Sequence, residues 1–253
     1  SLFASRTIDG RMVQHAKTGQ TVAGNECCPG LRCILTGGAP FYVEDIKAAV
    51  ACFGPRIAQV YGQGETPMTI SAISSDRIAA AVTMGDDEIL ASVGYPQTTV
   101  EIDILDGDGH PVPPGAMGEV TVRSPTVMLG YWDNPEATAQ TLPDGALRTG
   151  DVGLVDARGL LHLKDRSKDV IISGGTNIYP REVEEVLLRH LAVEEVSVIG
   201  VPDPEWGESV TAFVVRRADG SVDEAARNAR GIASIERFKR PKYYGFVPKL
   251  PNN

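Results

Sequence analysis

The sequence is poor in cysteine and contains no long apolar run, and each shortage argues against a class of protein. Its four cysteines all lie before residue 53, at spacings that match no zinc site, which favours the reduced thiols of a cytoplasmic protein. No apolar run approaches the roughly 20 residues that span a bilayer, and the first residues lack the pattern of a secretory signal. We therefore expect neither a zinc site nor a membrane span.

Basic charge is also scarce. The formal net charge is -9, and no basic block offsets it, which argues against a nucleic-acid partner and favours at most a small anion held by a few donors. The 253 residues are 42% hydrophobic and 23% charged, as in a soluble globular chain with one large domain or two smaller ones.

The first half of the chain has the pattern of a parallel α/β unit. A short apolar run at 31–35 ends in TGGAP and predicts a buried strand followed by a tight turn. Apolar residues between 43 and 53 recur at helical spacing, and residues 57–61 predict a second strand. From about residue 99 to Lys164, alternating strands with Gly/Asp turns predict a small antiparallel barrel or sheet.

The last stretch predicts a separate α+β module. Residues 170–172 form a short apolar strand, and Pro180 suits the first position of a helix. Further elements are expected as strands at 196–201, 210–215 and 243–247 and as a helix at 223–236. We therefore place a domain boundary near residue 166, with a first domain at 1–165 and a second at 166–253.

Six sequence blocks occur in one order: TGGAP (36–40), YGQGETP (61–67), GEVTVRSPTVMLGYWDNPEAT (118–138), RTGD (148–151), DRSKDVIISGGTNIYP (165–180) and VPDPEWGE (201–208). Together they resemble the adenylate-forming (AMP-binding) enzymes, specifically the acyl-CoA synthetases that act on fatty or aryl acids. The resemblance covers about residues 31–253 and implies an incomplete large α/β domain, followed by a small mobile C-terminal domain.

In that family a carboxylate attacks the α-phosphate of ATP, pyrophosphate leaves, and the thiol of coenzyme A then displaces AMP. The resemblance therefore implies ATP/AMP, Mg²⁺ and coenzyme A as cofactors and a small carboxylic acid, expected to be a fatty acid, as substrate. It assigns Glu65 to the magnesium ion and to catalysis, because a carboxylate oxygen is a hard ligand. It assigns the nucleotide to Gly38, Ala39, Pro40, Tyr61, Gly62, Gln63 and Gly64.

Within this set, Gly38 to Pro40 would form a wall beside adenine, the Tyr61 ring would stack on it, and Gly62 would leave room. A simple tight turn is the alternative for TGGAP. Gly64 is a departure, because the family usually has a threonine there whose hydroxyl meets the α-phosphate, and Thr66 lies one step beyond.

By the same resemblance Asp151 holds both ribose hydroxyls, Arg166 approaches the ribose from the other side, and Leu163 packs near adenine. A turn aspartate and a solvated arginine are the alternatives. Lys168 would be the hinge about which the small domain swings, and is counted with the catalytic residues. Ser173, Gly174 and Gly175 would lie against the pantetheine arm of coenzyme A.

Two parts of the family pattern are missing from the 253 residues: the glycine- and hydroxyl-rich phosphate loop and the catalytic lysine. We therefore expect roughly the C-terminal half of a ligase that adenylates poorly or not at all alone. Self-association or a missing N-terminal half would cover the apolar surface left open.

Other interpretations stay open at this point. Peptide-synthetase adenylation domains and luciferases share the first blocks, although Asn177 to Pro180 favour the CoA ligases. A non-catalytic nucleotide-binding remnant or an interaction module would lack turnover altogether. The acid, the oligomeric state and the role of residues 1–30 are not indicated by the sequence.

Overall fold

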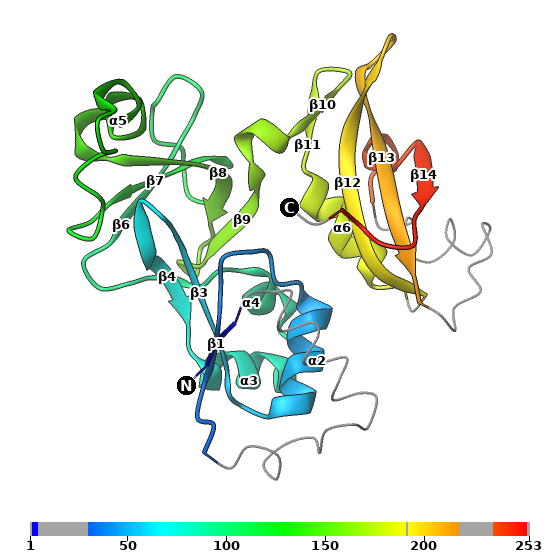
Figure 1. The fold of residues 1–253 in the computed structure, drawn as a ribbon, viewed down its shortest axis with the longest axis horizontal. Coiled ribbons are helices and arrows are strands. Elements are labelled where there is room, and N and C mark those ends of the chain that lie inside the picture. The colour runs from blue at the N-terminus through cyan, green and yellow to red at the C-terminus, as the bar shows by residue number, and fades with distance from the viewer. Residues whose placement is uncertain (1, 5–29, 191, 218–234, 252–253) are drawn as a thin grey trace. The chain divides into compact units, whose positions relative to one another are not determined.

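The computed structural model describes residues 2–4, 30–190, 192–217 and 235–251. The chain divides into two compact units, Ser1–Leu163 and Lys164–Asn253, and each is described by itself. Figure 1 shows the elements of both. None of the helices in the described ranges is long and apolar enough to cross a membrane.

The first unit contains a five-stranded sheet. Its order is β1 (Leu2–Ala4), β2 (Ile34–Thr36), β3 (Ile57–Gln63), β4 (Thr66–Ile73) and β5 (Tyr95–Pro96). The first three strands are parallel and the last two are antiparallel to their neighbours. Helix α2 (Val43–Phe53) connects β2 to β3, so the predicted parallel α/β unit is confirmed.

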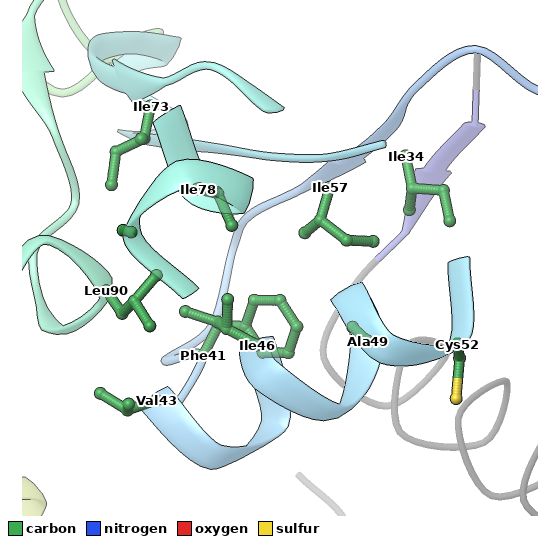
Figure 2. Packing of buried hydrophobic residues seen from close by; sticks show 11 residues of the cluster. Ile34, Phe41, Val43, Ile46, Ala49, Cys52, Ile57, Ile73, Ile78 and Leu90 are labelled. Atoms are coloured by element: carbon green, nitrogen blue, oxygen red, sulfur yellow. The ribbon is translucent and has the colours of Figure 1, made fainter. Parts of the chain in front are cut away.

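Three helices cover this sheet: α2, α3 (Ser75–Met84) and α4 (Asp87–Ala91). The apolar face of α2 buries Val43, Ile46 and Ala49 in one cluster with Ile34 and Ile57 of the strands. Figure 2 shows Ile46 and Ala49 on the side of the helix that faces Ile57. Each fully buried aliphatic side chain contributes roughly 1.5–3 kcal/mol, so this cluster holds β2 and β3 in place.

A second sheet in this unit has the order β6 (Glu101–Leu105), β7 (Gly118–Arg123), β8 (Leu147–Val155) and β9 (Leu161–Arg166). The sheet is open, so of the two predicted alternatives the antiparallel sheet is confirmed and the barrel is not. The reason is that its apolar face packs against Tyr61 and Ile70 of the first sheet instead of curling on itself. Helix α5 (Pro135–Thr141) and a 3-10 turn, η2 (Pro143–Gly145), lie between β7 and β8.

The second unit is an α+β module. Its sheet has the order β11 (Thr176–Ile178), β10 (Ile171–Ser173), β13 (Gly207–Arg216) and β12 (Val193–Asp203), and β14 (Tyr243–Phe246) pairs with β13 in parallel. Helix α6 (Pro180–Leu188) begins at Pro180 as predicted and buries Val183 and Leu187 against the strands. Among its described residues are also two 3-10 turns, η3 (Ser167–Asp169) and η5 (Arg237–Lys239). The helix expected at 223–236 falls largely on residues outside the described ranges.

Candidate functional site

The RTGD block forms a bulge in strand β8 that aims Asp151. The pairing of β7 with β8 shifts register between Glu119 and Thr121, and Gly150 within the bulge has φ +70°. The Thr149 hydroxyl donates to the Val120 carbonyl at 2.7 Å and accepts from the Asp151 amide at 3.1 Å. Glycine is needed because the left-handed conformation costs other residues about 1–2 kcal/mol, and bulges commonly redirect side chains beside active sites.

Asp151 meets Tyr61 and Gln63 where the two sheets of the first unit join. The Tyr61 hydroxyl donates to Asp151 Oδ2 at 2.5 Å, and Gln63 Nε2 donates to the same oxygen at 2.8 Å. Gln63 Nε2 also donates to the Thr149 carbonyl at 2.8 Å. Asp151 is only 7% exposed and Tyr61 8%. Two donors therefore hold a buried carboxylate in one orientation, which suits a preformed polar contact with a ligand.

Gly62 is required by a close approach of the chain itself. The β3–β4 pairing shifts register between Tyr61 and Gln63, and a Cβ at Gly62 would clash with the backbone of Met68 and lie 2.6 Å from the Thr66 carbonyl. Residues 67–70 of β4 stand opposite Gly62 alone, so the bulge lies on β4, where Met68 has φ +54°. The immediate reason for this glycine is therefore strand packing, and its role beside adenine stays a prediction.

Glu65 lies in the two-residue turn that joins β3 to β4, beside the exposed Gly64. Its carbonyl accepts from the Met128 amide at 2.7 Å, and its Oε1 accepts from the Tyr131 hydroxyl at 2.6 Å. This hydrogen bond raises the pKa of Tyr131 above its ordinary value, because the phenolate would repel the carboxylate. A partly exposed carboxylate at a turn fits Mg²⁺, which proteins often bind through one or two carboxylates together with substrate phosphates.

Thr66 does not replace the hydroxyl that Gly64 lacks. Its side chain is fully buried, and its hydroxyl lies 2.9 Å from Thr69 Oγ1 and 3.1 Å from Thr126 Oγ1. A third hydrogen bond joins Thr69 to Thr126. The hydroxyl of Thr66 is therefore committed to this threonine cluster.

The other predicted residues of the first unit occupy two places. Gly38 has φ +81° and is exposed with Ala39 and Pro40 in the turn after β2. Gly37, one residue earlier, faces Val60 of β3, where an added Cβ would lie 2.8 Å from the carbonyl oxygen. Leu163 packs against the same apolar cluster that contains Tyr61.

The predicted residues of the second unit lie on its surface. Arg166 and Lys168 are exposed, and Lys168 lies in η3. Ser173 is the partly exposed last residue of β10, and Gly174 and Gly175, both with positive φ, form the turn to β11. Trp206 braces this turn, since its carbonyl accepts from the Gly174 amide at 2.9 Å and its ring covers the position of a Gly174 side chain.

Sequence reasoning missed several residues of this site. Thr149 and Tyr131 stand inside quoted blocks but received no role, although one shapes the bulge and the other binds Glu65. Gln59 precedes Tyr61 by two residues on the same face of β3, is 4% exposed, and its Oε1 has no hydrogen-bond partner in the described structure. A glutamine on a buried strand is the signal that could have drawn attention to it.

Comparison with known proteins identifies the family. A model described as AMP-binding enzyme matches residues 3–132, and one described as AMP-binding enzyme C-terminal domain matches residues 182–253. The chain therefore belongs to the AMP-binding enzymes, and the predicted family and mixed α/β fold class are confirmed.

Individual relatives are similar over most of this chain. Medium/long-chain-fatty-acid–CoA ligase FadD8 of Mycobacterium tuberculosis is 40% identical over 228 residues, which are 87% of this chain and 39% of the relative. The solved amide bond synthetase McbA from Marinactinospora thermotolerans has a TM-score of 0.87 and 38% identity over 98% of this chain and 48% of its own.

A third relative was solved with a reaction intermediate. The o-succinylbenzoate CoA synthetase MenE from Bacillus subtilis, in complex with the acyl-adenylate intermediate OSB-AMP, has a TM-score of 0.81 and 33% identity. The match covers 99% of this chain and 48% of that one. The chain thus spans less than half the length of each of these three proteins.

Proposed function

We propose that these residues form the nucleotide- and thiol-handling part of an ATP-dependent carboxylic acid–CoA ligase. In the first step a carboxylate oxygen attacks the α-phosphorus of ATP and pyrophosphate leaves. In the second, the thiol sulfur of coenzyme A attacks the acyl carbon, the bond to phosphate breaks, AMP leaves and the thiol proton passes to solvent. The observation that carries the proposal is the buried Asp151 carboxylate, fixed by Tyr61 and Gln63 in a chain of the AMP-binding family.

Asp151 is proposed to hold the ribose, because an ionised carboxylate accepts from hydroxyl donors more strongly than a neutral group does. The Tyr61 ring and Leu163, which share one apolar cluster, would face adenine. The buried Gln59 Oε1 offers an acceptor on the same strand face as Tyr61, and an exocyclic amino group is a donor that would satisfy it.

Glu65 is proposed to hold Mg²⁺ at the phosphates, where a bound ion would offset charge developing on the α-phosphate. In the second unit, Arg166 would contact the ribose and Lys168 would serve as the hinge. The turn from Ser173 to Gly175 would face the pantetheine arm, since two glycines with positive φ let the backbone approach a ligand closely.

The 253 residues alone are proposed to adenylate an acid weakly or not at all, because they include neither a recognisable phosphate loop nor the glycine–lysine pair of the family pattern. ATP–pyrophosphate exchange with the purified chain should therefore stay near background. Exchange at the rate of an intact ligase would contradict this part of the proposal.

Calorimetric titration of the purified chain with AMP tests the ribose assignment. Asp151→Asn should weaken AMP binding at least about tenfold, because a hydrogen bond to a charged group contributes roughly 1.5–3 kcal/mol. Asp103→Asn is the matched control, since Asp103 is exposed on β6 and should leave the affinity unchanged. Equal affinities for Asp151→Asn and the unchanged chain would refute the assignment.

The thiol half-reaction can be tested without adenylation. When the purified chain is given a synthetic acyl-adenylate and coenzyme A, it should form acyl-CoA and AMP. Mass spectrometry detects both products. The likeness to an amide bond synthetase favours a second candidate, in which an amine replaces the thiol. An amine in place of coenzyme A is therefore the parallel reaction, and amide as the sole product would assign the chain to that second function.

A further inference from the structure

The Glu65 carboxylate is held by a residue from a distant part of the chain. Tyr131 donates its hydroxyl proton to Glu65 Oε1 at 2.6 Å, across 66 positions in the sequence. The backbone makes a second connection, since the Met128 amide donates to the Glu65 carbonyl at 2.7 Å. The segment 128–131 therefore fixes both the turn that carries Glu65 and the direction of its side chain.

Tyr131 is itself held in place by helix α5. Its amide donates to Thr138 Oγ1 at 2.9 Å, and the Thr138 hydroxyl donates to the Asn134 carbonyl at 2.8 Å. The Asn134 side chain accepts from the Ala137 amide and so caps the start of this helix. A continuous set of hydrogen bonds thus runs from the helix start to the carboxylate.

The chemical type of the donor matters. A lysine or arginine on Glu65 would compete with a cation for the carboxylate charge, whereas a neutral phenol orients the group and leaves that charge available. Tyr131 is 37% exposed, so this hydrogen bond contributes little to the stability of the fold.

We propose that Tyr131 is a positioning residue that orients Glu65 toward the divalent cation bound with ATP and thereby sets the affinity for that cation. This inference rests on the proposed function, because it takes Glu65 as the cation ligand. Groups that hydrogen-bond to a metal ligand typically change metal affinity about 10–100-fold when they are removed.

The test is Tyr131→Phe in the whole chain, which keeps the ring and removes the hydroxyl. ATP binding is measured by calorimetry at stepped Mg²⁺ concentrations, and Mn²⁺ uptake with ATP is followed by electron paramagnetic resonance. We expect the half-saturating Mg²⁺ concentration to rise at least about tenfold, while AMP affinity without metal and the melting temperature stay unchanged.

Two further variants sharpen the result. Thr138→Val removes the hydroxyl that holds the Tyr131 amide and should raise the Mg²⁺ requirement less, whereas Thr138→Ser keeps the hydroxyl and should resemble the unchanged chain. Tyr243→Phe is the control, because Tyr243 is an exposed tyrosine of the second unit.

The outcomes separate this inference from the proposed function. If ATP binding by the unchanged chain ignores Mg²⁺, the cation role of Glu65 is wrong and the inference falls with it. If the unchanged chain requires Mg²⁺ and Tyr131→Phe requires no more, only the inference is overturned. A Tyr131→Phe variant that loses AMP affinity and melts lower would likewise overturn it, because the residue would then be structural.

Discussion

The cluster of Asp151, Tyr61 and Gln63 and the segment 165–175 are both proposed to contact the substrates. They differ in burial and in how their residues are held in place. Asp151, Tyr61 and Thr149 are nearly inaccessible, and a hydrogen bond from Tyr61 to Asp151 joins the two sheets, while Thr149 accepts from the Asp151 amide within β8. Arg166, Lys168 and the glycines of the second segment are exposed.

The two regions therefore hold their proposed ligand-contacting groups in position in different ways. A buried polar network fixes side chains because any loss leaves an unpaired group, which costs about 1–3 kcal/mol. The exposed segment relies instead on backbone conformation, with Gly174 and Gly175 at positive φ and Trp206 against the turn. The hinge and the ligand-contacting turn proposed for this segment would suit such a design, because an exposed segment can change conformation at lower cost than a buried one.

The largest effect should come from Gly62→Ala, which would break the rigid side of this comparison. The new Cβ meets the backbone of Met68 and Thr66, so β4 must shift, and we expect a loss of about 3 kcal/mol in unfolding free energy. AMP affinity should fall too, because Gly62 lies between Tyr61 and Gln63, which hydrogen-bond to Asp151.

Gly64→Ala, in the same block, is the control. Its added Cβ has no atom within 4 Å, so it should change stability by less than about 0.5 kcal/mol. Chemical denaturation of both variants decides the point, and equal stabilities would contradict it.

An intermediate effect is expected in the exposed segment. Gly174→Ala places a Cβ at φ +57° and 2.7 Å from the Trp206 ring, which is half-exposed and able to move away. We expect a cost of about 1–2 kcal/mol, and a slightly smaller one for Gly175→Ala, which has positive φ but no neighbour. Chemical denaturation monitored by tryptophan fluorescence measures the unfolding free energy of both variants. A Gly174→Ala loss as large as that of Gly62→Ala would show that the second segment is as rigid as the first.

The smallest effect should be a pH dependence at Asp165, whose Oδ2 accepts from the Arg181 amide at the start of α6. Burial, and to a lesser extent Asp169, raises the pKa of Asp165 above its ordinary value of 3.8. The folded state therefore holds this proton to higher pH than the unfolded state, and the group's contribution to stability falls as pH rises from 3.8 through the raised pKa.

Asp165→Asn keeps an oxygen acceptor for Arg181 but cannot ionise. Its stability relative to the unchanged chain should therefore improve as pH rises from 3.8 through the raised pKa of Asp165, measured by thermal unfolding at a series of pH values. Glu205→Gln is the control, since Glu205 is an exposed carboxylate of the same unit. A stability difference that stays constant with pH would contradict the raised pKa.

Several features could be predicted because they depend on local chemistry. Pro180 begins α6 because its fixed φ and missing amide suit the first helical position. The parallel β2–α2–β3 unit followed from two short apolar strands around a helical repeat. The choice between a closed barrel and an open sheet could not be predicted, because alternation identifies a buried face but not its partner, and here the partner is the sheet that carries Tyr61.

The family, the β2–α2–β3 unit, the start of α6 and the candidate residues Asp151 and Glu65 could be recognised from neighbouring residues. Which polar groups meet depends on the packing of segments that are distant in the sequence. Tyr61 and Asp151 are 90 positions apart, and Glu65 and Tyr131 are 66 apart. Such pairs form when separate strands and loops pack together, and no local pattern specifies which hydroxyl will then face which carboxylate.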